Sequence, residues 1–303
     1  MALPKYANLL LDADLEAKIN TFLPSGNDVK IIIAGGSRGE QQLIPEIFES
    51  RTNLETVNIA KDIGGIAPFL HANNKYNYIN TSKIIIMSFS CLITNDGAYK
   101  NWYYSQSELT EMGLFNQLRL FKMDFPENWY RRIALIWDDI IHPKKGKKLS
   151  KDDSRLKTKG FLPKDESYDW EKLAEMDLNP KTTENYFYRR PNNNGIRKQV
   201  FVSTFNEFAQ LGTKIILIQP PLAPIWRQIT GENYMHKMEL EFAELLKDLA
   251  KQYDNVDCID FYTQQQVAFT NEFFNDATHL NERGAEVYTN ALIDSLWYRG
   301  LLE

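Results

Sequence analysis

The stretch VKIIIAGGSRG, residues 29–39, carries the strongest structural signal in the sequence. Its first part, residues 29–34, is rich in β-branched side chains and almost wholly apolar, which is typical of a strand buried on both faces of a parallel sheet. Two glycines end that run, and residues 40–49 follow with helical spacing. The stretch therefore predicts a strand, a tight turn and a helix, with Ser37 on the turn.

Four segments downstream resemble this first strand, and helical patterns separate most of them. The predicted strands are 56–60, 83–89, 214–219 and 255–261, and the predicted helices are 12–22, 40–49, 66–75, 234–253 and 282–297. Strands that alternate with helices form parallel sheets with right-handed crossovers. We therefore predict an α/β, three-layer, flavodoxin-like fold with a central five-stranded parallel sheet.

The stretch from about residue 97 to residue 194 supplies no strand for this sheet and separates the third predicted strand from the fourth. It contains a basic, polar run at 144–160, which we interpret as a solvated loop. Segments this long within a compact domain are usually functional caps or mobile loops. We predict that 97–194 is an insertion or cap within a single domain of residues 1–303. Its aromatic groups, at 102–104 and 186–188, either pack the insertion onto the domain or stack on sugar rings.

The composition excludes several classes of function. Of the 303 residues, 43% are hydrophobic and 25% are charged, which are ordinary values for a globular protein. The net charge of −5 argues against nucleic acid as a partner, because phosphate binding needs a basic surface. No run approaches the roughly 20 apolar residues that span a bilayer, and the N-terminal pattern is not that of a signal peptide. We expect no transmembrane segment and a cytoplasmic protein, or an extracytoplasmic one if a leader or anchor has been trimmed; the oligomeric state stays open.

Cysteines and histidines give no sign of a disulfide framework or a metal site. Cys91 and Cys258 lie within apolar runs and are predicted to be buried thiols. His71, His142 and His236 are scattered and lack metal-ligand spacing. We therefore expect neither a metal nor another cofactor.

Ser37 is the first candidate functional residue, because the loops at the C-terminal edge of a parallel sheet form its ligand crevice. The free backbone N–H groups of such a turn suit a nucleophile whose own N–H stabilises an oxyanion. One alternative is phosphate binding, although the turn matches neither the P-loop nor the G-x-G-x-x-G pattern. The other is a plain strand-to-helix turn with Ser37 as the N-cap. The neighbouring Arg38 either contacts substrate oxygens or pairs with Glu40 on the surface.

The second candidate site is NDATHLN, residues 275–281, directly before the last predicted helix. Asp276 and His279 are three residues apart there, and a turn can bring the carboxylate to Nδ1–H of the imidazole. That contact fixes the tautomer and leaves Nε2 free to act as a base. A purely structural histidine is the alternative.

Together the two segments resemble the SGNH (GDSL-type) hydrolase superfamily. GGSRGEQQLIPEIFE and LETVNIAKDIGG are similar to the family's first two blocks, and D-x-x-H-L-N before the last helix is similar to its final one. The resemblance covers residues 29–96 and 195–298 and implies the SGNH fold. It implies Ser37 as the nucleophile, His279 as the general base and Asp276 as the acid that orients the base.

The resemblance also implies an oxyanion hole made by the backbone N–H groups of Ser37 and Gly64, with Gly65 as the alternative glycine, and by Asn95. Two features depart from the family pattern. The aspartate that usually precedes the nucleophile is Gly36 here, and no glycine precedes Asn95 at the spacing of the usual G-x-N-D block. Loss of one oxyanion donor costs about 10²–10³ in rate, so weak or specialised activity is one expectation.

By this resemblance we expect a serine-dependent esterase or O-acyltransferase, similar to bacterial SGNH esterases and glycan O-acyltransferases. Its substrates would be O-acyl esters, with acetyl esters of a carbohydrate as the favoured class, and its reaction would pass through an acyl-enzyme. This step rests on analogy within a fold family. One alternative is a module of the same ancestry that binds a glycan or protein partner without catalysis. The other is a binder of phosphate or nucleotide through residues 35–39.

Overall fold

The computed structural model describes residues 13–23, 29–61, 66–78, 82–94, 148–164, 195–225, 234–264 and 267–302 of the chain. Within these residues, five parallel strands form one sheet in the order β2-β1-β3-β4-β5. The strands are β1 (Ile31–Gly35), β2 (Thr56–Asn58), β3 (Ile84–Ser88), β4 (Lys214–Gln219) and β5 (Val256–Asp260). This order is that of flavodoxin-like, doubly wound sheets, so the predicted α/β fold class is confirmed.

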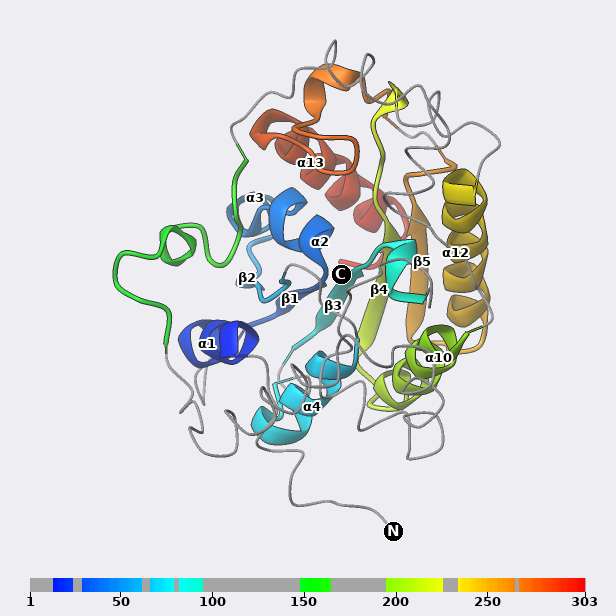
Figure 1. Ribbon diagram of the computed structural model, residues 1–303. Helices are drawn as coiled ribbons and strands as arrows, with labels where there is room; N and C mark the ends of the chain where they lie inside the picture. The colour runs from blue at the N-terminus through cyan, green and yellow to red at the C-terminus, as the bar shows by residue number, and fades with distance from the viewer. Residues whose placement is uncertain are drawn as a thin grey trace, which may run out of the picture.

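Helices cover both faces of the sheet (Figure 1). One face carries α2 (Ser37–Gln42), α3 (Pro45–Thr52) and α13 (Glu282–Tyr298), and the other carries α4 (Ala67–Tyr76), α10 (Ile196–Ala209) and α12 (Tyr234–Lys251). The first helix, α1 (Ala13–Phe22), lies on the β2 side of the sheet. The described residues also contain three short 3₁₀ helices, η3 (Cys91–Thr94), η4 (Ser154–Leu156) and η5 (Asn271–Phe273).

The single helix predicted at 40–49 is wrong, because the structure places two helices there. Leu43 and Ile44 are extended and separate α2 from α3. Pro45 is the first residue of α3, where its missing N–H costs nothing, and it disfavours a helical conformation for the residue before it. The break makes α2 a helix of only six residues.

The three central strands form the middle of the core. Ile33, Ile86 and Ile216 are paired in register across β1, β3 and β4, and all three are fully buried. Burying such a side chain contributes about 1.5–3 kcal/mol, which is why the apolar runs in the sequence predicted these strands. At the C-terminal edge, Gly35 of β1 lies in register with Ser88 of β3, and this pairing positions the turn that follows β1.

The segment 148–164, drawn in green in Figure 1, follows the outer edge of β2. The N–H of Asn58 in β2 donates to the carbonyl of Lys159 at 2.9 Å. Leu149 and Phe161 are buried. The predicted solvated loop at 144–160 is therefore wrong for the end of that run, because its backbone hydrogen-bonds to the edge of the sheet.

Other parts of the proposed insertion, 97–147 and 165–194, lie outside the described residues, and so do both of its aromatic groups. Its role as a cap and the single-domain boundaries stay predictions. No described helix has both the length and the apolar character that crossing a bilayer requires.

Candidate active site

Ser37 is the first residue of α2 and is held at the C-terminal edge of β1 by a turn of two glycines. Gly35 has φ +134°, and a Cβ at this position would lie 1.9 Å from the carbonyl oxygen of Ser88. Only glycine fits such a conformation and such a close approach. The N–H of Gly36 donates to the same carbonyl at 2.9 Å. The turn is thus pressed against β3, and the half-buried Ser37 begins the helix.

The loop before α13 holds the second candidate group. One carboxylate oxygen of Asp276, Oδ1, accepts hydrogen bonds from the backbone N–H groups of Thr278 at 2.8 Å and His279 at 2.9 Å. Asn281 caps α13, since its Oδ1 accepts from the N–H of Gly284 at 2.9 Å. The carboxylate of Asp276 therefore stabilises the conformation of this loop and fixes the backbone of His279.

The structure brings Ser37, His279 and Asp276 together, although the first two are 242 residues apart in sequence. His279 Nε2 lies 2.9 Å from Ser37 Oγ, and His279 Nδ1 lies 2.8 Å from Asp276 Oδ2. Because Nδ1 faces a carboxylate, it carries the ring proton, and Nε2 accepts the hydrogen bond from the hydroxyl. This is the geometry of a nucleophile, a base and a group that orients the base.

The carboxylate of Asp276 is the strongly perturbed charge in this arrangement. Burial alone would raise its pKa, but the hydrogen bond and charge of the His279 ring lower it, and so do the N–H groups of Thr278 and His279. Their combined effect brings the pKa of Asp276 down to about 2. The carboxylate is therefore ionised at neutral pH and can stabilise an imidazolium ion on His279.

Buried side chains connect α2, the helix that begins at Ser37, to its surroundings. Gln42, at the end of α2, donates through Nε2 to the carbonyl of Thr278 at 2.8 Å, which links α2 directly to the histidine loop. Asn58 in β2 donates through Nδ2 to the carbonyl of Gly39 at 2.8 Å. Sequence reasoning missed both residues, because nothing in the local pattern distinguishes them from other polar side chains.

Arg38 forms a buried ion pair that the sequence did not predict. Its side chain is buried, and Nη2 donates to Oε1 of Glu239 in α12 at 2.9 Å. Glu40 is also buried, and its Oε1 lies 2.7 Å from Nζ of Lys18 in α1. This burial corrects the prediction of a surface pair between Arg38 and Glu40, whereas contact of Arg38 with a substrate stays a prediction.

The chain is similar to several solved structures at low sequence identity. No protein-family model matches the chain, and no curated protein matches it in sequence. A lipase/acylhydrolase from Enterococcus faecalis is 12% identical with a TM-score of 0.44, over 89% of this chain and 96% of that one. A member of the lipolytic G-D-S-L family from Veillonella parvula is 13% identical with a TM-score of 0.40, over 88% and 96%. An alpha/beta hydrolase from the metagenome of Lake Arreo, Spain, is 12% identical with a TM-score of 0.42, over 93% and 99%.

Among the predicted oxyanion donors, only Ser37 belongs to the described residues. Gly64, its alternative Gly65, and Asn95 lie outside them. Gly36, the N-cap of α2, has no side chain that could cap the start of the helix. The first N–H groups of a helix have no carbonyl partner one turn earlier, so the N–H of Ser37, the first residue of α2, suits a developing oxyanion.

The described residues contain no group of three or more His, Cys, Asp or Glu side chains that could hold a metal ion. His236 Nδ1 contacts Tyr262 Oη at 2.5 Å. Cys91 is buried and Cys258 is half-buried, and both are free thiols. Burial raises the pKa of Cys258 to about 12, so this sulfur is not a nucleophile at neutral pH.

Proposed function

We propose that the chain is an SGNH-type serine hydrolase that cleaves O-acyl esters through an acyl-enzyme. The observation that carries this proposal is the contact of His279 Nε2 with Ser37 Oγ at 2.9 Å, with Asp276 on the opposite ring nitrogen. The two sequence segments that resemble the family supply these three residues. Their position at the C-terminal edge of a parallel sheet suits a ligand crevice.

In the proposed mechanism, His279 takes the proton of Ser37 while Oγ attacks the ester carbonyl carbon. The carbonyl electron pair moves onto oxygen, and the N–H of Ser37 stabilises the oxyanion, with Gly64 and Asn95 as further proposed donors. The intermediate then collapses, the C–O bond to the alcohol breaks, and the imidazolium gives its proton to the departing alkoxide. Water or a sugar hydroxyl, deprotonated by His279, then attacks the acyl-enzyme and releases Ser37.

For the substrate we propose an acyl ester of a carbohydrate, with acetyl as the acyl group. The support for this class is the sequence resemblance to bacterial glycan O-acyltransferases. Hydrolysis and transfer share the acyl-enzyme, and the exclusion of water from the site decides between them. Release of acetate from acetylated sugars, compared with acetyl transfer to an added unacetylated sugar, separates the two outcomes.

The deciding experiment is labelling with a fluorophosphonate, read by intact mass, on the native protein and on Ser37→Ala. We expect one adduct on the native protein and none on Ser37→Ala, because only a hydroxyl activated by His279 attacks the phosphorus. Ser37→Ala should abolish ester turnover while its circular dichroism stays native. Equal turnover in Ser37→Ala would refute the proposal.

A non-catalytic binding module is the second candidate, and the departure from the G-x-N-D block at Asn95 favours it. It predicts no adduct on well-folded native protein, together with glycan binding that Ser37→Ala retains.

A further inference from the structure

The nucleophile helix α2 has only six residues, and every one after Ser37 is buried. Isolated helices of this length are not stable, so contacts with the rest of the molecule set the orientation of α2. Successive residues of a helix are about 100° apart around its axis. Arg38 and Glu40 therefore leave α2 on nearly opposite sides, and both form buried ion pairs.

The first ion pair connects α2 to α12 and β4. Arg38 Nη2 lies 2.9 Å from Glu239 Oε1, and the two side chains are 4% and 0% exposed. The second carboxylate oxygen of Glu239 accepts a hydrogen bond from Nε2 of Gln219, the last residue of β4. Glu239 is thus held from two directions while it holds Arg38.

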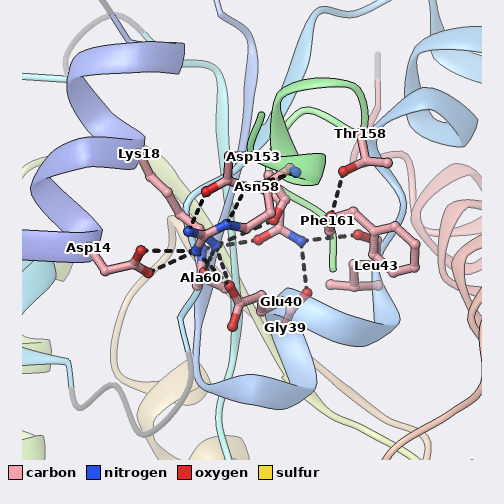
Figure 2. Close-up of polar contacts among 12 residues, drawn as sticks. Asp14, Lys18, Gly39, Glu40, Leu43, Asn58, Ala60, Asp153, Thr158 and Phe161 are labelled. Carbon is pink, nitrogen blue, oxygen red and sulfur yellow. Dashed lines mark hydrogen bonds and ion pairs between the residues drawn. The ribbon is translucent and has the colours of Figure 1, made fainter. Parts of the chain in front are cut away.

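The second ion pair connects α2 to α1 and to the segment 148–164 (Figure 2). Nζ of Lys18, a fully buried residue, donates to Glu40 Oε1 at 2.7 Å, to the carbonyl of Gly160 at 3.3 Å and to the carbonyl of Ala60. These three acceptors match the three donors of an ammonium group. Burial lowers the pKa of Lys18, and the charge of Glu40 opposes that effect. Arg155 Nη1 supports the same carboxylate from 3.5 Å.

We propose that Glu239 and Lys18 are positioning residues for the reaction. They act through Arg38 and Glu40 to fix the rotation of α2 about its axis. This inference rests on the proposed function, because the quantity that the two residues would control is the distance from Ser37 Oγ to His279 Nε2. Buried ion pairs contribute little net stability, because desolvation offsets their attraction. Two buried ion pairs on opposite sides of one short helix are therefore better explained by a role in orienting α2 than by a role in stabilising the fold.

The consequence for catalysis is that loosening either pair lets Ser37 move relative to His279. A misplacement of 1 Å costs on the order of 100-fold in rate. The fold tolerates small shifts of α2, whereas proton transfer needs Ser37 Oγ within hydrogen-bond reach of His279 Nε2. Loss of a positioning residue should therefore lower kcat and leave KM nearly unchanged.

The test compares Glu239→Ala, Glu239→Gln and Lys18→Met with the native protein. For each, kcat, KM on p-nitrophenyl acetate and the rate of fluorophosphonate labelling at Ser37 are measured below the variant's own unfolding temperature. We expect Glu239→Ala to lower kcat and the labelling rate about 10–100-fold, with KM within about twofold. Glu239→Gln keeps an acceptor for Arg38, so it should retain most of the native kcat and labelling rate. Lys18→Met should lower kcat in the same way.

A matched control and a second variant keep the inference falsifiable. Lys214→Met removes the ion pair with Asp257, whose Oδ2 lies 2.6 Å from Lys214 Nζ at the opposite edge of the sheet, and should leave kcat unchanged. Lys18→Met replaces a buried cation with an apolar chain of similar length and leaves Arg155 beside Glu40. It therefore tests the inference even if Glu239→Ala fails to fold.

The outcomes separate the inference from the proposed function. If native protein is labelled at Ser37, but folded Glu239→Ala and Lys18→Met react at the native rate, the pairs are only structural and the inference is overturned. The inference is also overturned if Lys214→Met lowers kcat as much as they do. If native protein shows neither an adduct nor turnover, the proposed function fails and the inference fails with it.

Discussion

At the scale of single residues, Asp276 is a carboxyl group whose ionisation is coupled to the native fold. Its pKa in the folded protein is about 2, below the ordinary value of 3.8, because His279 and two backbone N–H groups favour the carboxylate. A carboxyl group whose folded pKa is lowered contributes stability that is present above its unfolded pKa and is lost as the pH falls through the folded value.

We therefore expect Asp276 to stabilise the protein at pH 5 and above and to lose that contribution between about pH 4 and pH 2. The side chain of Asp276 is 36% exposed, so solvent screening reduces its contribution to the free energy of unfolding to about 1 kcal/mol. Urea unfolding of native protein and Asp276→Asn at a series of pH values measures this contribution. The difference in unfolding free energy between the two should shrink as the pH falls over that range. A difference that stays constant down to pH 2 would contradict the low pKa.

At the scale of elements, the turn between β1 and α2 has a sharp steric requirement. Gly35→Ala should destabilise the protein by about 1–3 kcal/mol from its backbone conformation alone, and the clash with the Ser88 carbonyl adds to this. The turn should shift, and labelling at Ser37 should slow markedly. Chemical denaturation and labelling rates measure the two effects.

Two other glycines provide matched controls for Gly35→Ala. A Cβ at Gly36 would meet nothing within 4 Å and its φ is not positive, so Gly36→Ala should be close to native in stability. Gly212 has φ +81° but open space around it, so Gly212→Ala isolates the cost of the backbone conformation. If Gly35→Ala were no more damaging than Gly212→Ala, the contact with β3 would not be what shapes the turn.

The strands were predictable from sequence because their signal is local. The strand at 214–219 appears at its predicted residues, since an apolar run of that length has few other ways to be buried. The break at Leu43 and Ile44 was missed, because the apolar spacing continues through it and proline is tolerated in a first helical turn.

The candidate site was predictable only where residue types form a pattern. Ser37, Asp276 and His279 lie in short segments that resemble a known family, so sequence alone could select them. The hydrogen bonds of Asn58 with Leu43, of Gln42 with Thr278 and of Arg38 with Glu239 join residues that are 15 to 236 positions apart in sequence. Long-range contacts of this kind produce no periodicity or spacing in the sequence, and the pairing of Arg38 with Glu239 was missed for the same reason.

At the scale of the whole molecule, the segment 148–164 closes one edge of the sheet. An uncovered edge strand presents unpaired backbone groups to other chains, and here the N–H of Asn58 in β2 is paired with the carbonyl of Lys159. The N–H of Leu162 also donates to the carbonyl of Glu40 at 3.0 Å, so the same segment contacts α2. Part of the proposed insertion is therefore integral to the α/β core.

The docking of this segment depends on Gly160, which has φ +97°. A Cβ there would lie 1.8 Å from the carbonyl oxygen of Asn58, so Gly160→Ala should lift the segment from β2. We expect limited trypsin digestion of Gly160→Ala to cut within 148–164, at Lys151, Arg155 or Lys157, several-fold faster than in native protein. Gly212→Ala, which has similar backbone strain in open space, should keep the native cleavage rate there. Unchanged cleavage in a folded Gly160→Ala would mean that the segment is held by its side chains alone.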